Sequence, residues 1–240
     1  MNFKKEKRET ALLLKSIPSV ITTLFVVSVV CMNLLAQKTL VQTRFLALDG
    51  GILISWLSFM CMDIITKYFG PKASNKVAVL ASVINLLTCG IFYIVSIIPS
   101  SAADYTAFNQ IFGGTWFVLL SSTVAFLFSA MINNILNFSI GKIFKRNPDG
   151  KLAFITRSYI STFVGQFLDN LIFSTLVFTL FAPIFWNGFH WTFLQCVMCA
   201  LTGAVAEVVM EIIFSPVAFY IIGIWNKENV GKEYLEEVAK

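Results

Sequence analysis

The chain has 240 residues, of which 57% are hydrophobic and only 13% are charged. Soluble proteins carry about 25% charged residues, so this chain has too little polar surface to be solvated as a soluble globule. The formal net charge of +5 does not indicate nucleic acid as a partner, because the basic residues lie in short gaps between apolar stretches, where anionic lipid headgroups account for them. The composition therefore predicts a protein that resides in the lipid bilayer.

Six apolar stretches follow a basic start: Ile17–Leu35, Ile52–Ile65, Val77–Ile98, Ile111–Ile140, Ile160–Phe181 and Phe193–Trp225. A hydrocarbon layer about 30 Å thick requires about 20 residues of helix, so we expect the short second stretch to extend over Gly50, Gly51 and 66–69. The sequence predicts an all-α integral membrane protein with six transmembrane helices in one bundle, over residues 17–225. A basic segment, 1–16, precedes the bundle, and a charged tail, 226–240, follows it as a short helix or a disordered end.

Lys and Arg are concentrated in every second gap. Sixteen of the eighteen lie in the two terminal segments and in the gaps after the second and fourth stretches. Cytoplasmic loops retain basic residues. We therefore expect a protein of the bacterial plasma membrane with both termini in the cytoplasm, and with Thr43, Asp104 and Asn187 on the outer side. No cleavable signal is predicted, and the first stretch should remain as a span.

No metal or other cofactor is expected. All five Cys lie inside apolar stretches, where a thiol behaves as a small hydrophobic group, and His190 is the one histidine in the chain. A cluster of His and Cys ligands is therefore not predicted. The sequence also has no phosphate-binding loop of the Gly-x-x-x-x-Gly-Lys-Ser/Thr type, so this chain is not expected to hydrolyse ATP.

Four carboxylates fall within or beside the apolar stretches: Asp63, Asp169, Glu207 and Glu211. An ionisable group at this depth is costly, and is retained mostly where it faces a cavity, a partner or a transport pathway. Glu207 and Glu211 share a helix face, so one should hold a proton or a cation should lie between them; a structural partner such as Arg157 or Lys67 is an equal alternative. For Asp63 the alternative is an ion pair with Lys67, four residues later.

A polar stripe follows one face of the fifth stretch. Polar and small residues recur at three- and four-residue steps, so that they share one side of a helix: Ser158, Thr162, Gly165, Gln166, Asp169, Asn170 and Phe173. Hydrogen bonding between helices explains Ser158 and Thr162. A carboxylate beside two amides exceeds what packing requires, so Gln166, Asp169 and Asn170 are predicted to bind a solute.

Four motifs occur in order along the chain: Asn33 to Lys38, Asp63 to Gly70, Arg157 to Phe173, and Glu211 five residues before Pro216. Together they resemble the motifs of the vitamin uptake transporter family, of the queuosine precursor transporter type. The resemblance implies a six-helix importer of 7-deazaguanine compounds: the nitrile or aminomethyl precursor of queuosine, or the base queuine. Lys67 stands where relatives usually have Glu, and Glu207 where they often have Lys, which leaves the exact substrate open.

A 7-deazaguanine presents N1–H and a 2-amino group side by side, which one carboxylate accepts as a pair, while O6 needs a donor. Asp169, with Gln166, Asn170 and Asn33, offers both kinds of group, and Trp56, Phe59, Trp116 and Phe173 are candidates to stack on the base. The predicted substrate-binding residues are Asn33, Trp56, Asp63, Arg157, Gln166, Asp169, Asn170, Phe173, Glu207 and Glu211.

Three classes of function fit these observations to different degrees. A solute importer explains the carboxylates and amides within the spans. A substrate-binding subunit that depends on a separate energising complex explains them as well, and the oligomeric state is open. A membrane aspartic protease would need two carboxylates that share a proton in settings such as Gly-x-Gly-Asp, and neither Asp63 nor Asp169 has one.

Overall fold

The computed structural model describes residues 3–101, 104–143 and 151–239, although the side chains of some residues in these ranges are not described. Helices account for nearly all of the described chain. They are α1 (Phe3–Ser16), α2 (Ser19–Leu35), α3 (Ile52–Phe69), α4 (Pro71–Ile97), α5 (Thr106–Gly113), α6 (Thr115–Ile143), α7 (Lys151–Ser174), the π-helix η1 (Thr175–Phe181), α8 (Ala182–Phe185), α9 (Phe193–Glu228) and α10 (Lys232–Ala239).

The predicted all-α membrane bundle is confirmed. Among the described residues, five helical segments are long and apolar enough to cross a bilayer, namely 52–69, 71–97, 106–129, 162–185 and 193–214. The count rises to six if the bent pair α1–α2 is taken as one span. The axes of α1 and α2 meet at 99°, because Pro18 has no backbone N–H to donate and separates the two helices. The second span extends to Phe69 as expected, but it begins at Ile52, after both glycines.

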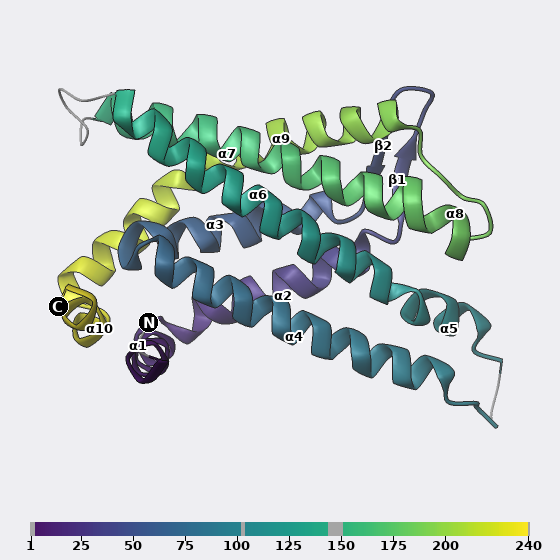
Figure 1. Cartoon of the computed structure of the whole chain (residues 1–240), viewed down its shortest axis with the longest axis horizontal. Helices are drawn as coiled ribbons and strands as arrows, with labels where there is room; N and C mark the ends of the chain where they lie inside the picture. The colour runs from purple at the N-terminus through teal and green to yellow at the C-terminus, as the bar shows by residue number, and fades with distance from the viewer. Residues whose placement is uncertain (1–2, 102–103, 144–150, 240) are drawn as a thin grey trace.

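The two ends of the bundle differ in what they carry (Figure 1). At one end lie both termini, with α1 and α10 packed against each other across the ends of the spans, together with the α3–α4 turn at Gly70. At the opposite end lie the turn of the β-hairpin, α5 and α8. The two terminal segments and the α3–α4 turn, three of the four segments in which basic residues are concentrated, therefore lie at one end of the molecule.

Helix α4 shows how a span divides its faces between protein and lipid. Its buried residues recur at three- and four-residue steps and are mostly small, and they include Ala73, Val77, Ala81 and Asn85. Large apolar side chains such as Ile91, which is 61% exposed, cover the opposite face. Small residues let helix backbones approach each other inside a bilayer, and the large apolar ones face the hydrocarbon.

A β-hairpin between α2 and α3 interrupts the otherwise all-α pattern. Strands β1 (Thr39–Gln42) and β2 (Ala47–Asp49) pair antiparallel. The side-chain amide of Gln195, at the start of α9, donates to the carbonyl oxygen of Thr43 at 2.6 Å. A Cβ at Gly50 would lie 2.7 Å from the carbonyl oxygen of Leu35, so glycine is what allows the hairpin to pack against the end of α2.

The carboxyl-terminal tail is a helix fixed to the bundle. The Tyr68 hydroxyl lies 2.9 Å from the carbonyl oxygens of both Trp225 and Val230, and Arg8 of α1 forms an ion pair with Glu237 of α10 at 3.3 Å. One apolar core joins α1, α2, α3, α4, α9 and α10 near this end, and a second lies under the hairpin around Phe178 and Trp191.

Candidate functional site

Three adjoining cavities lie between the helices. The first, here called the tail cavity, has a volume of about 790 Å³, part of it open to solvent, and reaches along α3 to Asp63 and Lys67. The second, the hairpin cavity, is about 500 Å³ and reaches Asn33 and Asp49. The third, of similar size, lies against α4. Phe59 lines all three cavities.

The hairpin cavity brings together five of the residues predicted from the sequence. They come from α2, α7 and α9, and they are Asn33, Asp169, Asn170, Phe173 and Glu207. Asn33 is only 2% exposed, and its side-chain amide donates to the Val29 carbonyl oxygen of its own helix at 3.0 Å. The polar stripe of α7 therefore faces a cavity rather than lipid, over the part carrying Asp169 to Phe173.

Asp169 is held in place by a neighbouring helix. The hydroxyl of Ser129, on α6, donates to Oδ1 of Asp169 at 2.9 Å. One hydrogen bond leaves much of the accepting capacity of a carboxylate unused. Asp169 also lines the cavity against α4, so its carboxylate is available to a ligand at the centre of the bundle.

Unpaired polar atoms are concentrated at these cavities. Among the described residues, five buried side-chain atoms lack a hydrogen-bond partner, and three of the five belong to Gln166, Asn170 and Glu207. Each of these residues lines the hairpin cavity or the tail cavity. Glu207 is 5% exposed and lines both, with Ser55 and Asn170 beside its carboxylate. Because a buried polar atom without a partner costs about 1 to 3 kcal/mol, their convergence makes these cavities the candidate site.

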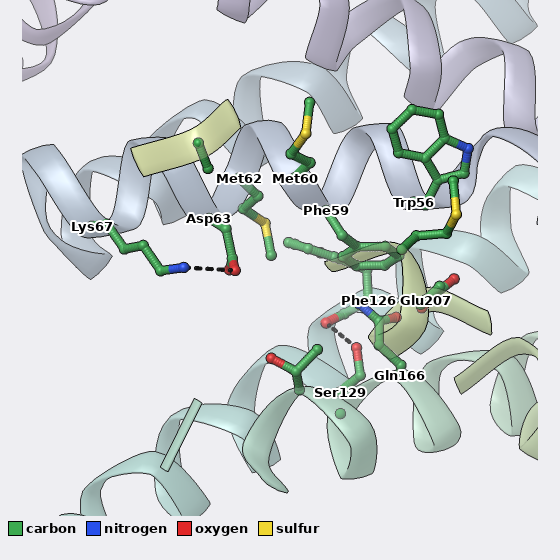
Figure 2. A pocket seen from close by; sticks show the side chains of 14 residues that line it. Trp56, Phe59, Met60, Met62, Asp63, Lys67, Phe126, Ser129, Gln166 and Glu207 are labelled. Carbon is green, nitrogen blue, oxygen red and sulfur yellow. Dashed lines mark hydrogen bonds and ion pairs between the residues drawn. The ribbon is translucent and has the colours of Figure 1, made fainter. Parts of the chain in front are cut away.

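The tail cavity contains the remaining predicted residues whose side chains are described (Figure 2). Trp56, Asp63, Gln166 and Glu207 line it. The Trp56 ring stacks on Phe214 with centroids 4.5 Å apart, and its indole N–H donates to Leu53. The Asp63 carboxylate pairs with Lys67 at 3.6 Å, so the alternative of an ion pair within one helix is realised in this structure.

Three sequence-based expectations stand apart from these cavities. Arg157 and Glu211, on α7 and α9, are residues whose side chains fall outside the described part of the structure. Trp116, suggested as a stacking surface, lines none of the three cavities and instead packs edge-on against Phe117, Phe181 and Phe185.

Asp49 is a cavity residue that the sequence analysis missed. It is 7% exposed, lines the hairpin cavity, and accepts the backbone N–H of Gly51 at 2.7 Å. A carboxylate just before a helix compensates the unpaired N–H groups and the dipole at the helix start, so capping α3 is a sufficient structural role. The sequence signal for this capping role is Asp-Gly-Gly before an apolar stretch. The position of Asp49 at the cavity could not be predicted in this way, because it depends on the β-hairpin.

Asp49 gives a pH dependence that can be measured. Burial raises the pKa of Asp49 from 3.8 to about 6, and the backbone hydrogen bonds that it accepts only partly offset this effect. Between these pH values the folded protein binds more protons than the unfolded one, so stability should fall as the pH rises through this window and then level off. Thermal unfolding in detergent from pH 4 to 8 should show this slope, and Asp49→Asn should reduce it. An equal slope in the variant contradicts the assignment.

Comparison with known proteins now adds to this geometry. The vitamin uptake transporter family matches residues 49–222. The chain belongs to the vitamin uptake transporter family. A protein of Bacillus subtilis (strain 168) named "Probable queuosine precursor transporter" is 30% identical over 151 residues, which are 62% of this chain and 64% of that protein. The chain thus matches less than two thirds of the length of this relative, and no solved structure matches it.

The match to the vitamin uptake transporter family covers most of the elements that build the cavities, with α2 (Ser19–Leu35) outside it. Residues 49–222 include α3, α7 and most of α9, and with them Asp49, Asp169 and Glu207. The protein is therefore a multi-pass membrane protein of a transporter family.

Proposed function

We propose that the protein imports a 7-deazaguanine precursor of queuosine across the bacterial plasma membrane, with both termini in the cytoplasm, and that it is a transporter rather than an enzyme. The observation that carries the proposal is the convergence of Asp169, Asn170 and Phe173 on one cavity of about 500 Å³. The name of the Bacillus subtilis relative supports the substrate class.

The groups in the hairpin cavity complement such a base. Ser129 donates to Oδ1 of Asp169, which leaves Oδ2 and a second lone pair of Oδ1 to accept the 2-amino group and N1–H as a pair. The Asn170 amide nitrogen lies beside the Glu207 carboxylate and makes no other hydrogen bond among the described residues, so we assign it as the donor for O6. Phe173 and Phe59 also line the cavity and supply apolar faces for a flat ring.

The position of the cavities suggests how the base passes through the bundle. Glu207 and Phe59 line both the hairpin cavity and the tail cavity, so they lie where a solute leaves one cavity for the other. Binding near the middle of the membrane, between regions that open to opposite sides, is the usual arrangement in secondary transporters. A residue at this boundary can contact the solute from either side.

Uptake in a host that lacks its own queuosine-precursor importer tests the proposal. The precursor is supplied outside the cell, and queuosine is measured in the transfer RNA. Expression of this chain should restore queuosine, whereas Asp169→Asn at equal expression should not. The proposed function is contradicted if the host contains folded protein in its membrane, is supplied with each precursor, and still has no queuosine in its transfer RNA.

The orientation is tested by cysteine labelling from outside. Lys72, in the first turn of α4, and Asp104, two residues before α5, are exposed, and the start of α4 and α5 lie at opposite ends of the bundle. The distribution of basic residues predicts that Lys72 faces the cytoplasm. In intact cells an impermeant maleimide should label Asp104→Cys and not Lys72→Cys, with the wild-type chain as the blank for native thiols. Lysed cells should label both, which shows that both are reactive. Labelling of Lys72→Cys in intact cells reverses the topology.

Gly203 on α9 gives a second test, because it makes room for Asn170. A Cβ at position 203 would lie 2.8 Å from the amide nitrogen of Asn170 and 3.1 Å from its Cγ. Gly203→Ala should displace the amide and lower uptake about tenfold, the effect of losing one hydrogen bond to the base. Gly223→Ala is the matched control, since a Cβ there meets nothing within 4 Å. Equal uptake by the two variants would remove Asn170 from the site.

A further inference from the structure

Two acceptor atoms in one wall of the tail cavity have no donor. Oε1 of Gln166 and Oε2 of Glu207 are both buried without a hydrogen-bond partner, and the two residues are only 6% and 5% exposed. Both line the tail cavity, and Figure 2 shows their side chains on the same wall. A ligand that satisfies them must donate hydrogen bonds.

The described titratable side chains around these atoms are mostly acidic. Among the described side chains that line the hairpin cavity, three are carboxylates, Asp49, Asp169 and Glu207, and none is Lys, Arg or His. Asp169 is close enough for its charge to act on Glu207. In the tail cavity Asp63, on α3, is paired with Lys67. The other titratable group that lines the hairpin cavity is the thiol of Cys199, on α9.

We propose that Glu207 and Gln166 form an ammonium subsite, so that the protein selects a cationic, amine-bearing base over a neutral analogue of the same ring. The inference rests on the proposed function, and it identifies the aminomethyl precursor, rather than the nitrile, as the preferred substrate. Because Glu207 lines both cavities, the ring can occupy the hairpin cavity while the amine extends toward the tail cavity.

An ammonium group has the chemistry that this wall lacks. It offers three N–H donors and no acceptor, and it meets Oε2 of Glu207 and Oε1 of Gln166 with a charge-assisted hydrogen bond at the carboxylate. The aromatic face of Phe59, in the same cavity, favours a cation. A metal ion fits less well, since the described residues contain no group of three His, Cys, Asp or Glu that could hold one.

A cationic substrate couples uptake to the membrane potential. Each transported molecule carries one positive charge inward, so an interior that is negative by 100 mV favours accumulation by about 50-fold. This chain would then need no separate energising subunit. A neutral nitrile would gain nothing from the potential and would leave the Glu207 carboxylate without a cation.

The test uses purified full-length protein in liposomes, with a potassium diffusion potential that is negative inside. Labelled aminomethyl and nitrile bases are supplied separately, and initial rates are compared for wild type, Glu207→Gln and Asp104→Asn. The initial rate of wild type should be at least about tenfold higher for the aminomethyl base than for the nitrile base, the effect expected of one hydrogen bond to a charged group. The membrane potential should accelerate the uptake of the aminomethyl base and not that of the nitrile base. Glu207→Gln should lose the preference mainly by slower aminomethyl uptake, and Asp104→Asn, which removes an exposed loop carboxylate, should keep it.

Several outcomes overturn the subsite. Equal wild-type rates for the two bases, an equal loss of both in Glu207→Gln, or uptake driven by a proton or sodium gradient without a potential would each reject it. Transport of the nitrile base in any of these cases leaves the proposed function intact. Failure of wild type to transport either base counts against the proposed function itself.

Discussion

Asp169→Asn is expected to reduce uptake by one to two orders of magnitude or more while leaving the protein folded in the membrane. The amide replaces one acceptor oxygen by a donor, so the paired acceptance of N1–H and the 2-amino group is lost. Each polar group left unpaired costs about 1 to 3 kcal/mol. Initial rates in cells, normalised to the amount of folded protein from size-exclusion chromatography, measure the effect.

Ser129→Ala provides the control for this prediction. It removes the hydroxyl that donates to Asp169 but leaves the carboxylate, so uptake should fall much less than in Asp169→Asn. If the Asn variant transports at a near-normal rate, Asp169 does not bind the substrate, and the stripe on α7 serves only to join helices.

Gln166→Met is expected to change stability and uptake in opposite directions. Methionine has nearly the shape of glutamine and removes an oxygen that is buried without a partner, so the empty protein should become more stable by about 1 kcal/mol or more. At this chain length that corresponds to about 2 to 4 °C in melting temperature per kcal/mol. Uptake should fall at least about tenfold, because the same oxygen is the one that a ligand would satisfy.

Gln195→Met is the matched control, since both ends of this amide are paired. Its oxygen accepts the backbone N–H of Thr192 at 2.8 Å, and its nitrogen donates to the Thr43 carbonyl oxygen at 2.6 Å. The melting temperature of this variant should fall. A fall of similar size in Gln166→Met would show that the Gln166 amide is a structural group, and would contradict the idea that a ligand completes the site.

The membrane spans could be predicted from the sequence because the bilayer imposes one simple requirement, a long apolar helix. The local breaks depended on finer features. The fourth stretch divides at Gly114 into α5 and α6, where a Cβ would lie 3.0 Å from the Gln110 carbonyl oxygen. The fifth ends in the π-helix η1, whose residues look as apolar as those of any other span.

The candidate site was predictable where one helix carries it. Gln166, Asp169 and Asn170 could be found from spacing alone, since residues three and four apart share a face. Asp49 could not, because it reaches the hairpin cavity only through the pairing of β1 and β2 and the close approach that Gly50 and Gly51 permit. The ion pair between Asp63 and Lys67 was the local alternative, and it forms because the two side chains are one helical turn apart.

The central claim is that this chain by itself carries a 7-deazaguanine base across a membrane. The most direct measurement is the uptake of a labelled base into liposomes that contain the purified protein and no other. Wild-type liposomes are predicted to take up the base well above protein-free liposomes, and Asp169→Asn liposomes are predicted not to. The contradicting result is that liposomes with folded wild-type protein take up no more base than protein-free liposomes, although the same chain restores uptake in cells. That result would indicate a subunit that depends on an energising partner.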